Sequence, residues 1–222
     1  MDALIGEFPL YAAGFLGTLR LCLFAAIGSL VLGTLLAAFR VSPLPPLRFV
    51  GLAWVTVFRN SPLVVVLFLF AFGFPQIGVR FPEFANNAFF WSGVAGLIAY
   101  TAAFVCEAVR SGINSVPPGQ AEAARAVGLT FQQTLGTIVL PQALRSVVPP
   151  LGSVVIAMIK NSAIVGAFGV TGELFSVDGA LTATGQYSAL SILTGVAICY
   201  LVITIPAGIA LGVIERRIEV KR

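Results

Sequence analysis

Five long runs of apolar residues, separated by short polar segments, dominate the chain. Windows of about 19 residues place these runs near 15–39, 49–74, 89–110, 134–170 and 189–214. A hydrocarbon core roughly 30 Å thick requires about 20 apolar helical residues, because each residue adds about 1.5 Å. Every run reaches that length. The pattern predicts an all-α, polytopic transmembrane helix bundle with five spans.

The fourth run is too long for one straight crossing and contains four helix-disrupting residues, Pro141, Pro149, Pro150 and Gly152. Proline removes a backbone donor and bends a helix, which a membrane protein tolerates only where neighbours or water satisfy the freed groups. We therefore expect a break in this run, with a short helix first and the true crossing at about 151–169.

Basic residues in the polar segments predict the orientation. The N-terminus and the segments 75–88 and 171–188 hold one, Arg80. The alternate segments hold eight: Arg40, Arg48, Arg110, Arg125, Arg216, Arg217, Lys221 and Arg222. Because cytoplasmic loops are enriched in Lys and Arg, the N-terminus is expected outside, and the C-terminus and the 111–133 loop in the cytoplasm.

Composition agrees with lipid as the main solvent, since 58% of the 222 residues are hydrophobic and 10% are charged. The net charge of +4 reports topology and does not indicate a nucleic-acid partner. With no linker, low-complexity tract or repeat, residues 1–222 read as one transmembrane domain. Glycines at 28, 33, 208 and 212 are expected at close helix contacts.

No catalytic or metal-binding constellation is present in the sequence. It has no histidine, and its three cysteines lie far apart inside apolar runs, which favours small buried hydrophobes. No cofactor, metal or catalytic residue is therefore expected in this chain.

The segment 117–141 is the most polar continuous stretch, and it predicts a short helix in water. Two prolines open it and Gly128 is suited to the left-handed conformation that ends a helix. Glu122 and Arg125 are three residues apart and are expected to pair. Its alanines leave little side-chain bulk, so the helix suits insertion into a groove of a partner protein.

These residues resemble the EAA loop of ABC-importer permeases. The match comprises seven positions at fixed spacing: Glu122, Ala123, Ala124, Gly128, Ile138, Leu140 and Pro141. Further segments are similar to the polar amino-acid branch of that family, most like glutamate- or glutamine-type permeases. They are Arg59–Asn60–Ser61–Pro62, the run 104–124, the run 160–164, and Glu173 with Leu174.

The resemblance implies the type I importer fold in a bacterial inner membrane, and a set of partners. These are a cytoplasmic ABC ATPase dimer, which would hold ATP and Mg, an extracytoplasmic amino-acid-binding protein, and a second permease subunit, identical or different. The implied ATPase-docking residues are Gly119, Gln120, Glu122, Ala123, Ala124, Arg125 and Gly128. The chain itself has no GxxxxGK[ST] loop, so it is not expected to be an enzyme.

Polar residues within the spans are candidates for the substrate path, because charges at bilayer depth are costly and often functional. The candidates are Arg59, Asn60, Ser61, Thr101, Lys160, Asn161 and Ser162. Arg59 and Lys160 would attract carboxylates. A structural role is the alternative for each, with Arg59 binding backbone carbonyls freed by Pro62, and Glu107 pairing with Arg145.

Two functions follow as hypotheses. The first is the permease subunit of an ATP-driven importer that moves a polar amino acid, glutamate or glutamine, into the cytoplasm. The alternative is a self-sufficient secondary amino-acid carrier or channel, for which inverted repeats would be expected and are not found.

Overall fold

The computed structural model describes residues 2–81, 88–168 and 172–218, which contain helices and no strand. In chain order the elements are α1 (Asp2–Gly6), α2 (Phe8–Val41), α3 (Pro45–Asn60), α4 (Leu63–Phe68), η1 (Leu69–Gly73), α5 (Phe74–Gln76), α6 (Ala88–Asn114), α7 (Pro118–Ala126), α8 (Phe131–Gln133), η3 (Thr134–Val139), α9 (Leu140–Ala167), α10 (Ser176–Thr184) and α11 (Ala189–Ile218). The labels η1 and η3 mark π-helical turns.

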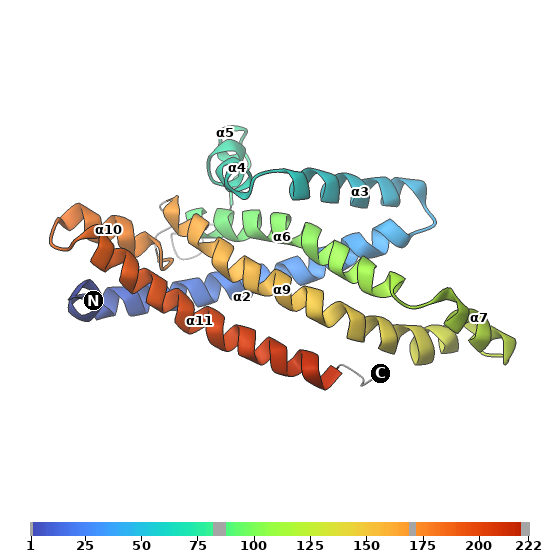
Figure 1. Cartoon of the computed structure of the whole chain (residues 1–222). Helices are drawn as coiled ribbons and strands as arrows, with labels where there is room; N and C mark the ends of the chain where they lie inside the picture. Colours follow the sequence, from blue (N-terminus) through green and yellow to red (C-terminus); the bar gives the residue numbers. More distant parts are fainter. Residues whose placement is uncertain (1, 82–87, 169–171, 219–222) are drawn as a thin grey trace.

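The long helices run side by side and give the molecule two distinct ends (Figure 1). The N-terminus and α10 lie at one end, which we call the α10 end. Helix α7 projects from the other, the α7 end, toward which α11 runs as it finishes. The two termini therefore lie toward opposite ends, as an odd number of crossings requires. The basic residues Lys221 and Arg222 lie outside the described residues.

Four helices are long and apolar enough to cross a membrane, and a bent pair supplies a fifth span if it is counted as one. The four are Phe8–Val41, Phe89–Asn114, Phe131–Ala167 and Ala189–Ile218. The bent pair joins Pro45–Asn60 to Leu63–Gln76. The prediction of an all-helical bundle with five apolar runs of spanning length is confirmed in this form.

The second apolar run is not the continuous helix that hydropathy predicts. It bends by 110° between α3 and α4. Ser61 (φ −93°, ψ 139°) and Pro62 (φ −60°, ψ 132°) both adopt extended backbone. Proline disfavours the helical conformation in the residue before it and lacks the N–H that would continue the ladder. Two extended residues in succession then turn the chain.

The fourth run, in contrast, is not broken where we expected it. Phe131–Ala167 forms a helix of 37 residues, and Pro149 and Pro150 lie inside α9. Gly112 of α6 packs so closely here that a Cβ on it would lie 3.0 Å from the Val147 backbone nitrogen. Gly112 and Val147 are therefore in close contact at the turn that precedes the two prolines.

Both π-helical turns stand just before a proline. η1 ends at Gly73, two residues before Pro75, and η3 ends at Val139, two residues before Pro141. A proline ring clashes with the carbonyl four residues earlier in a regular α-helix, and a π turn widens the helix at that place. The wide turn explains why Pro141 does not interrupt the fourth run.

Helices α2 and α6 form the centre of the bundle, and glycines allow their close approach. A Cβ on Gly33 would lie 2.8 Å from the Ala102 carbonyl oxygen of α6, and one on Gly28 would collide with Ile98. The expected packing role of these two glycines is confirmed. It is wrong for Gly208 and Gly212 of α11 within this chain. A Cβ on Gly208 would have its nearest neighbour at 3.9 Å, and one on Gly212 none within 4 Å.

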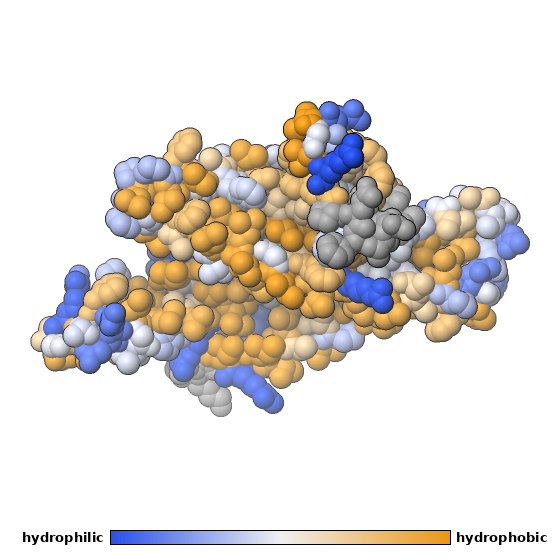
Figure 2. Space-filling view, turned by 180° about the vertical axis from the view of Figure 1, so that it is seen from behind, coloured by the Kyte–Doolittle hydropathy of each residue, from blue (hydrophilic) through white to orange (hydrophobic). Residues whose placement is uncertain are grey.

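Apolar side chains cover the middle of the molecule's outer surface. Figure 2 shows a broad hydrophobic area over the visible face, with hydrophilic side chains gathered mainly toward the ends. In the most hydrophobic stretch of α11, only 6% of the residues are buried within the chain. Exposed apolar area on this scale requires lipid or a partner subunit around it.

The close contact between α2 and α6 predicts that Gly33→Ala destabilises the chain. The new methyl group overlaps Val105 and the Ala102 carbonyl, and overpacking costs about 1–3 kcal/mol. Thermal unfolding in detergent, followed with a thiol-reactive dye that reports exposure of the buried Cys22 and Cys106, measures the loss. Gly212→Ala is the matched control and should not lower the melting temperature, since its methyl group meets nothing. Equal melting temperatures for the two variants would contradict the packing argument.

Candidate functional site

Helix α7 is defined at both ends by the residues that the sequence pattern singled out. Pro117 is extended (φ −58°, ψ 133°) and Pro118 occupies the first turn, where a missing N–H costs nothing. At the other end Gly128 is left-handed (φ 90°). The Leu129 N–H donates to the Ala124 carbonyl (3.1 Å) and the Gly128 N–H to the Arg125 carbonyl (3.0 Å). This pair of bonds is a Schellman motif, so the predicted stop at Gly128 is confirmed.

The predicted docking residues form an exposed surface. All seven lie on α7 or in the turn after it, and only Ala124 among them is buried. Two large apolar side chains extend this surface: Val127 is 79% exposed and Phe131 is 74% exposed. Apolar side chains this exposed, next to a polar helix, are typical of a contact surface for another protein.

The ion pair that we expected between Glu122 and Arg125 is absent from the described residues. The Arg125 Nε–H donates instead to the Ala121 carbonyl of its own helix (3.3 Å). Exposed pairs of this spacing contribute only a few tenths of a kcal/mol, so local hydrogen bonds compete with them. Both charged groups therefore stay available to a partner.

A short, well-capped turn joins α7 to the longest helix of the chain. The Thr130 hydroxyl accepts from the Gln133 N–H (3.3 Å), and the Gln133 side chain accepts from the Thr130 N–H (2.9 Å). This capping box fixes the start of the helix that runs from Phe131 to Ala167. Residues 131 and 161 are then about 45 Å apart along one rigid element.

A cavity of about 280 Å³ lies where this long helix packs against α6. Its lining residues are Tyr100, Thr101, Phe104, Ser153, Val154, Ala157, Met158 and Asn161. Apolar and aromatic groups make most of the wall, and a few hydroxyl and amide groups interrupt it. A small polar molecule fits such a wall, because apolar surface excludes water while the polar groups fix orientation.

Only some of the predicted substrate-path residues of α6 and α9 line this cavity. Thr101 and Asn161 line it. Lys160 is exposed and is not part of the wall. Ser162 faces elsewhere: it is buried, donates to the Ile159 carbonyl (2.8 Å) and lies 3.3 Å from the Tyr200 hydroxyl. Successive helical residues point about 100° apart, which explains why three neighbours separate.

Arg59, at the end of α3, is not a lining residue of this cavity, but it contacts one of them, Phe104. Its guanidinium lies over the Phe104 ring, 5.9 Å from the centroid, and 3.5 Å from the Glu107 carboxylate. The side chains of Asn60 and Ser61 donate to carbonyls of their own helix, those of Thr56 (2.7 Å) and Val57 (2.8 Å). They cap the helix where it breaks and do not reach the cavity wall.

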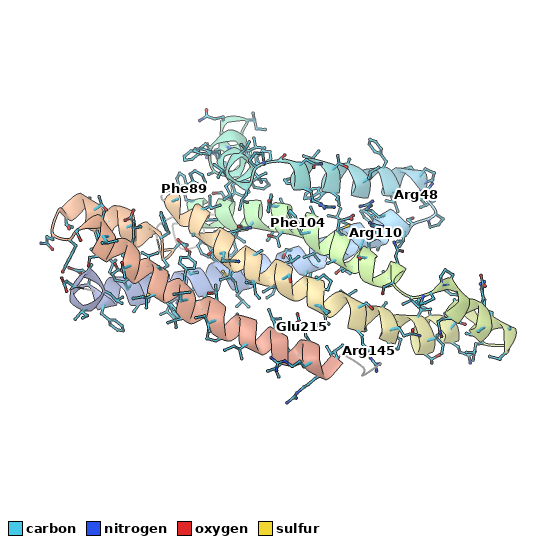
Figure 3. The ribbon with its side chains drawn as sticks, viewed as in Figure 1. Arg48, Phe89, Phe104, Arg110, Arg145 and Glu215 are labelled. Atoms are coloured by element: carbon cyan, nitrogen blue, oxygen red, sulfur yellow. The ribbon has the colours of Figure 1, made fainter. Side chains whose placement is uncertain are left out.

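Glu107 of α6 is the centre of an ion-pair cluster that holds three helices. Its carboxylate contacts Arg40 of α2 and Arg59 of α3, and accepts from Arg110 of α6 at 2.9 Å. Figure 3 shows Arg110 on α6 beside α3. The expected pairing of Glu107 with Arg145 is wrong. Arg145 lies on α9 and lines a different cavity, whereas Arg110 is one turn from Glu107. One carboxylate among three guanidinium groups leaves the cluster positively charged.

Glu173 is a fully buried carboxylate, to which the sequence assigned no role in transport. It is 0% exposed, accepts from the Thr18 hydroxyl (3.0 Å) and the Phe175 N–H (2.6 Å), and contacts the Tyr200 hydroxyl. Burial raises the pKa of Glu173, and these hydrogen bonds oppose the shift. The network ties the segment before α10 to α2 and α11. The sequence signals were an acidic residue between two spans and the resemblance of Glu173 with Leu174 to the polar amino-acid branch.

Comparisons with known proteins agree with this architecture. Residues 29–220 match the family model described as binding-protein-dependent transport system inner membrane component. The probable glutamine ABC transporter permease protein GlnM of Bacillus subtilis (strain 168) is 38% identical over 219 residues, 99% of this chain and 98% of that protein. The glutamate transport system permease protein GluC of Corynebacterium efficiens is 38% identical over 221 residues, 96% of each chain.

A solved structure gives the same result in three dimensions. The crystal structure of an amino acid ABC transporter with histidines contains a chain that is 31% identical, with a TM-score of 0.87 and 97% of each chain covered. The family match spans most of the sequence, and the relatives are permease subunits rather than enzymes. The chain therefore belongs to the family of binding-protein-dependent transport system inner membrane components, the multi-pass permeases of ABC importers.

Proposed function

We propose that this permease moves a polar amino acid, glutamate or glutamine, into the cytoplasm through the cavity between α6 and α9. Alternating access is driven by an ABC ATPase dimer that docks on α7. The observation that carries the proposal is the uninterrupted helix Phe131–Ala167. It begins at the docking surface and contributes Ser153, Ala157 and Asn161 to the cavity wall.

The mechanism follows from the rigidity of that helix. An ATPase that binds α7 more tightly in one of its states than in the other shifts the permease toward the matching packing. The capped turn at Thr130 passes a displacement of α7 to α9. Because α9 forms one wall of the cavity and α6 the other, the displacement opens the cavity to one side or the other.

The choice of cargo rests on the relatives and on charge. GlnM and GluC carry glutamine and glutamate in their names, and Arg59 belongs to the positively charged cluster beside Phe104. A guanidinium attracts and orients a carboxylate, which every amino acid has. The hydroxyl of Thr101 and the amide of Asn161 supply neutral contacts to the rest of the molecule.

The other partners follow from the two ends of the molecule. The α7 end faces the cytoplasm in this proposal, and the N-terminus and α10 face an extracytoplasmic amino-acid-binding protein. A second permease subunit, identical or different, completes the pore. Part of the exposed apolar surface of α2 and α11 remains for it and for lipid.

Reconstitution into proteoliposomes tests the proposal. Together with its ATPase, its binding protein and a second permease where one is encoded, the chain should take up labelled glutamate or glutamine only when ATP is present. Uptake by the purified chain without an ATPase would establish the secondary-carrier alternative and reject the proposal.

Charge reversal on α7 should uncouple the permease from its ATPase. Glu122 is exposed, so Glu122→Lys changes docking and leaves folding intact; uptake should fall at least about tenfold, the effect of roughly 1.4 kcal/mol. Co-purification of the ATPase and ATP-dependent uptake measure the effect. The matched control is Asp2→Lys, an exposed charge reversal at the α10 end, which should retain co-purification of the ATPase. Normal uptake by the Glu122 variant would count against docking on α7.

Removal of one hydroxyl from the cavity should weaken cargo binding. Thr101→Val keeps the side-chain shape and deletes the donor, and a hydrogen bond to a charged group contributes about 1.5–3 kcal/mol, so KM should rise roughly tenfold or more. Thr194→Val is the control, because that hydroxyl donates to the Leu190 carbonyl of its own helix (2.6 Å) and lies outside the cavity. Unchanged KM in the Thr101 variant would place the cargo elsewhere.

A further inference from the structure

A second polar cavity lies at the α7 end, between α9 and α11, and the transport mechanism does not use it. Its volume is about 310 Å³, and its lining residues are Leu144, Arg145, Val148, Arg217 and Ile218. Two guanidinium groups from different helices thus share one cavity with three apolar side chains. Arg145 and Arg217 are both exposed.

Within the described residues, no ion pair compensates the positive charge of this cavity. The ion pairs of the described residues all involve Glu107, so neither Arg145 nor Arg217 is in one. Glu215 is the nearest acidic residue along α11. Its carboxylate lies near Gly152, about 10 Å further along α9 than Arg145. Figure 3 shows Glu215 and Arg145 on the two neighbouring helices.

The cavity lies where apolar helix surface meets the charged end of the bundle. On α11 the side chains of Ile209, Val213 and Ile214 are 63%, 44% and 44% exposed, and basic residues begin at Arg216. On α9 the Leu144 side chain is 56% exposed directly before Arg145. A molecule that fills the cavity therefore meets hydrocarbon on one side and two positive charges on the other.

We infer that this cavity binds the phosphate headgroup of an anionic phospholipid, with an acyl chain lying along Leu144 and Val148. Guanidinium groups bind phosphate oxygens through paired N–H donors. Basic cavities between membrane helices bind anionic headgroups. Each basic residue near an anionic membrane surface contributes about 1 kcal/mol to membrane binding. With the orientation proposed above, the lipid belongs to the cytoplasmic leaflet. Its binding requires neither cargo nor ATPase.

Lipid retention by the purified chain tests the inference without transport. The detergent-solubilised protein is titrated with dioleoylphosphatidylglycerol or dioleoylphosphatidylcholine, and bound lipid is counted by native mass spectrometry. The anionic lipid should bind to the unmodified chain about tenfold more tightly than the zwitterionic one. Equal binding of the two headgroups would overturn the inference and needs no variant.

Charge-matched variants locate the site. Arg145→Gln with Arg217→Gln should lower phosphatidylglycerol affinity about tenfold, while Arg20→Gln with Arg48→Gln removes the same charge from exposed positions outside the cavity and should leave affinity unchanged. Equal effects of the two pairs would reduce the preference to net charge and reject the site. Loss of ATPase co-purification with lipid affinity intact would assign the arginines to the ATPase instead.

Discussion

The helix from Phe131 to Ala167 is the element on which the rest of the structure depends. A membrane helix keeps its backbone groups bonded to one another, so a displacement applied at one end appears at the other. Three prolines threaten that continuity. A π turn precedes Pro141, and Pro149 and Pro150 lie inside α9, where Gly112 packs against Val147. The helix therefore connects the capped turn after α7 directly to the cavity wall formed by Ser153, Ala157 and Asn161.

A partly buried carboxylate, Glu107, and a fully buried one, Glu173, join helices toward opposite ends of this bundle by different interactions. Glu107 is surrounded by three guanidinium groups, which compensate its charge and join α2, α3 and α6. Glu173 has hydroxyl and N–H donors and no cation among the residues that contact it. Because burial raises the pKa of Glu173, its neutral form is favoured at a higher pH than for a free glutamate. Ion pairs join the helices at one end, and hydrogen bonds from uncharged donors join them at the other.

The sequence predicted the features that depend on composition and local geometry. Hydropathy located all five apolar runs, and glycine at 128 predicted the end of α7, because its left-handed backbone is a local property. Which prolines break a helix was not predictable in this way. Pro62 turns the chain, whereas Pro149 lies inside a continuous helix, where Gly112, 37 residues earlier in the chain, packs against Val147. The predicted pairing of Glu107 with Arg145 was wrong for a similar reason, because ion pairing between helices depends on how each helix is rotated about its axis.

The same distinction applies to the candidate cargo site. Polar residues within a span were correctly treated as exceptional, yet Lys160, Asn161 and Ser162 have three different surroundings. Only Asn161 of the three lines the cavity, because it shares a face with Ser153 and Ala157, four and eight residues before it. The sequence alone does not distinguish the exposed charge of Lys160, or the hydroxyl of Ser162 with its structural hydrogen bonds, from a residue that lines the cavity. What distinguishes the three residues is the direction in which each points around the axis of α9. Only the face of α9 that carries Asn161 lies opposite Thr101 and Phe104 of α6 in the cavity.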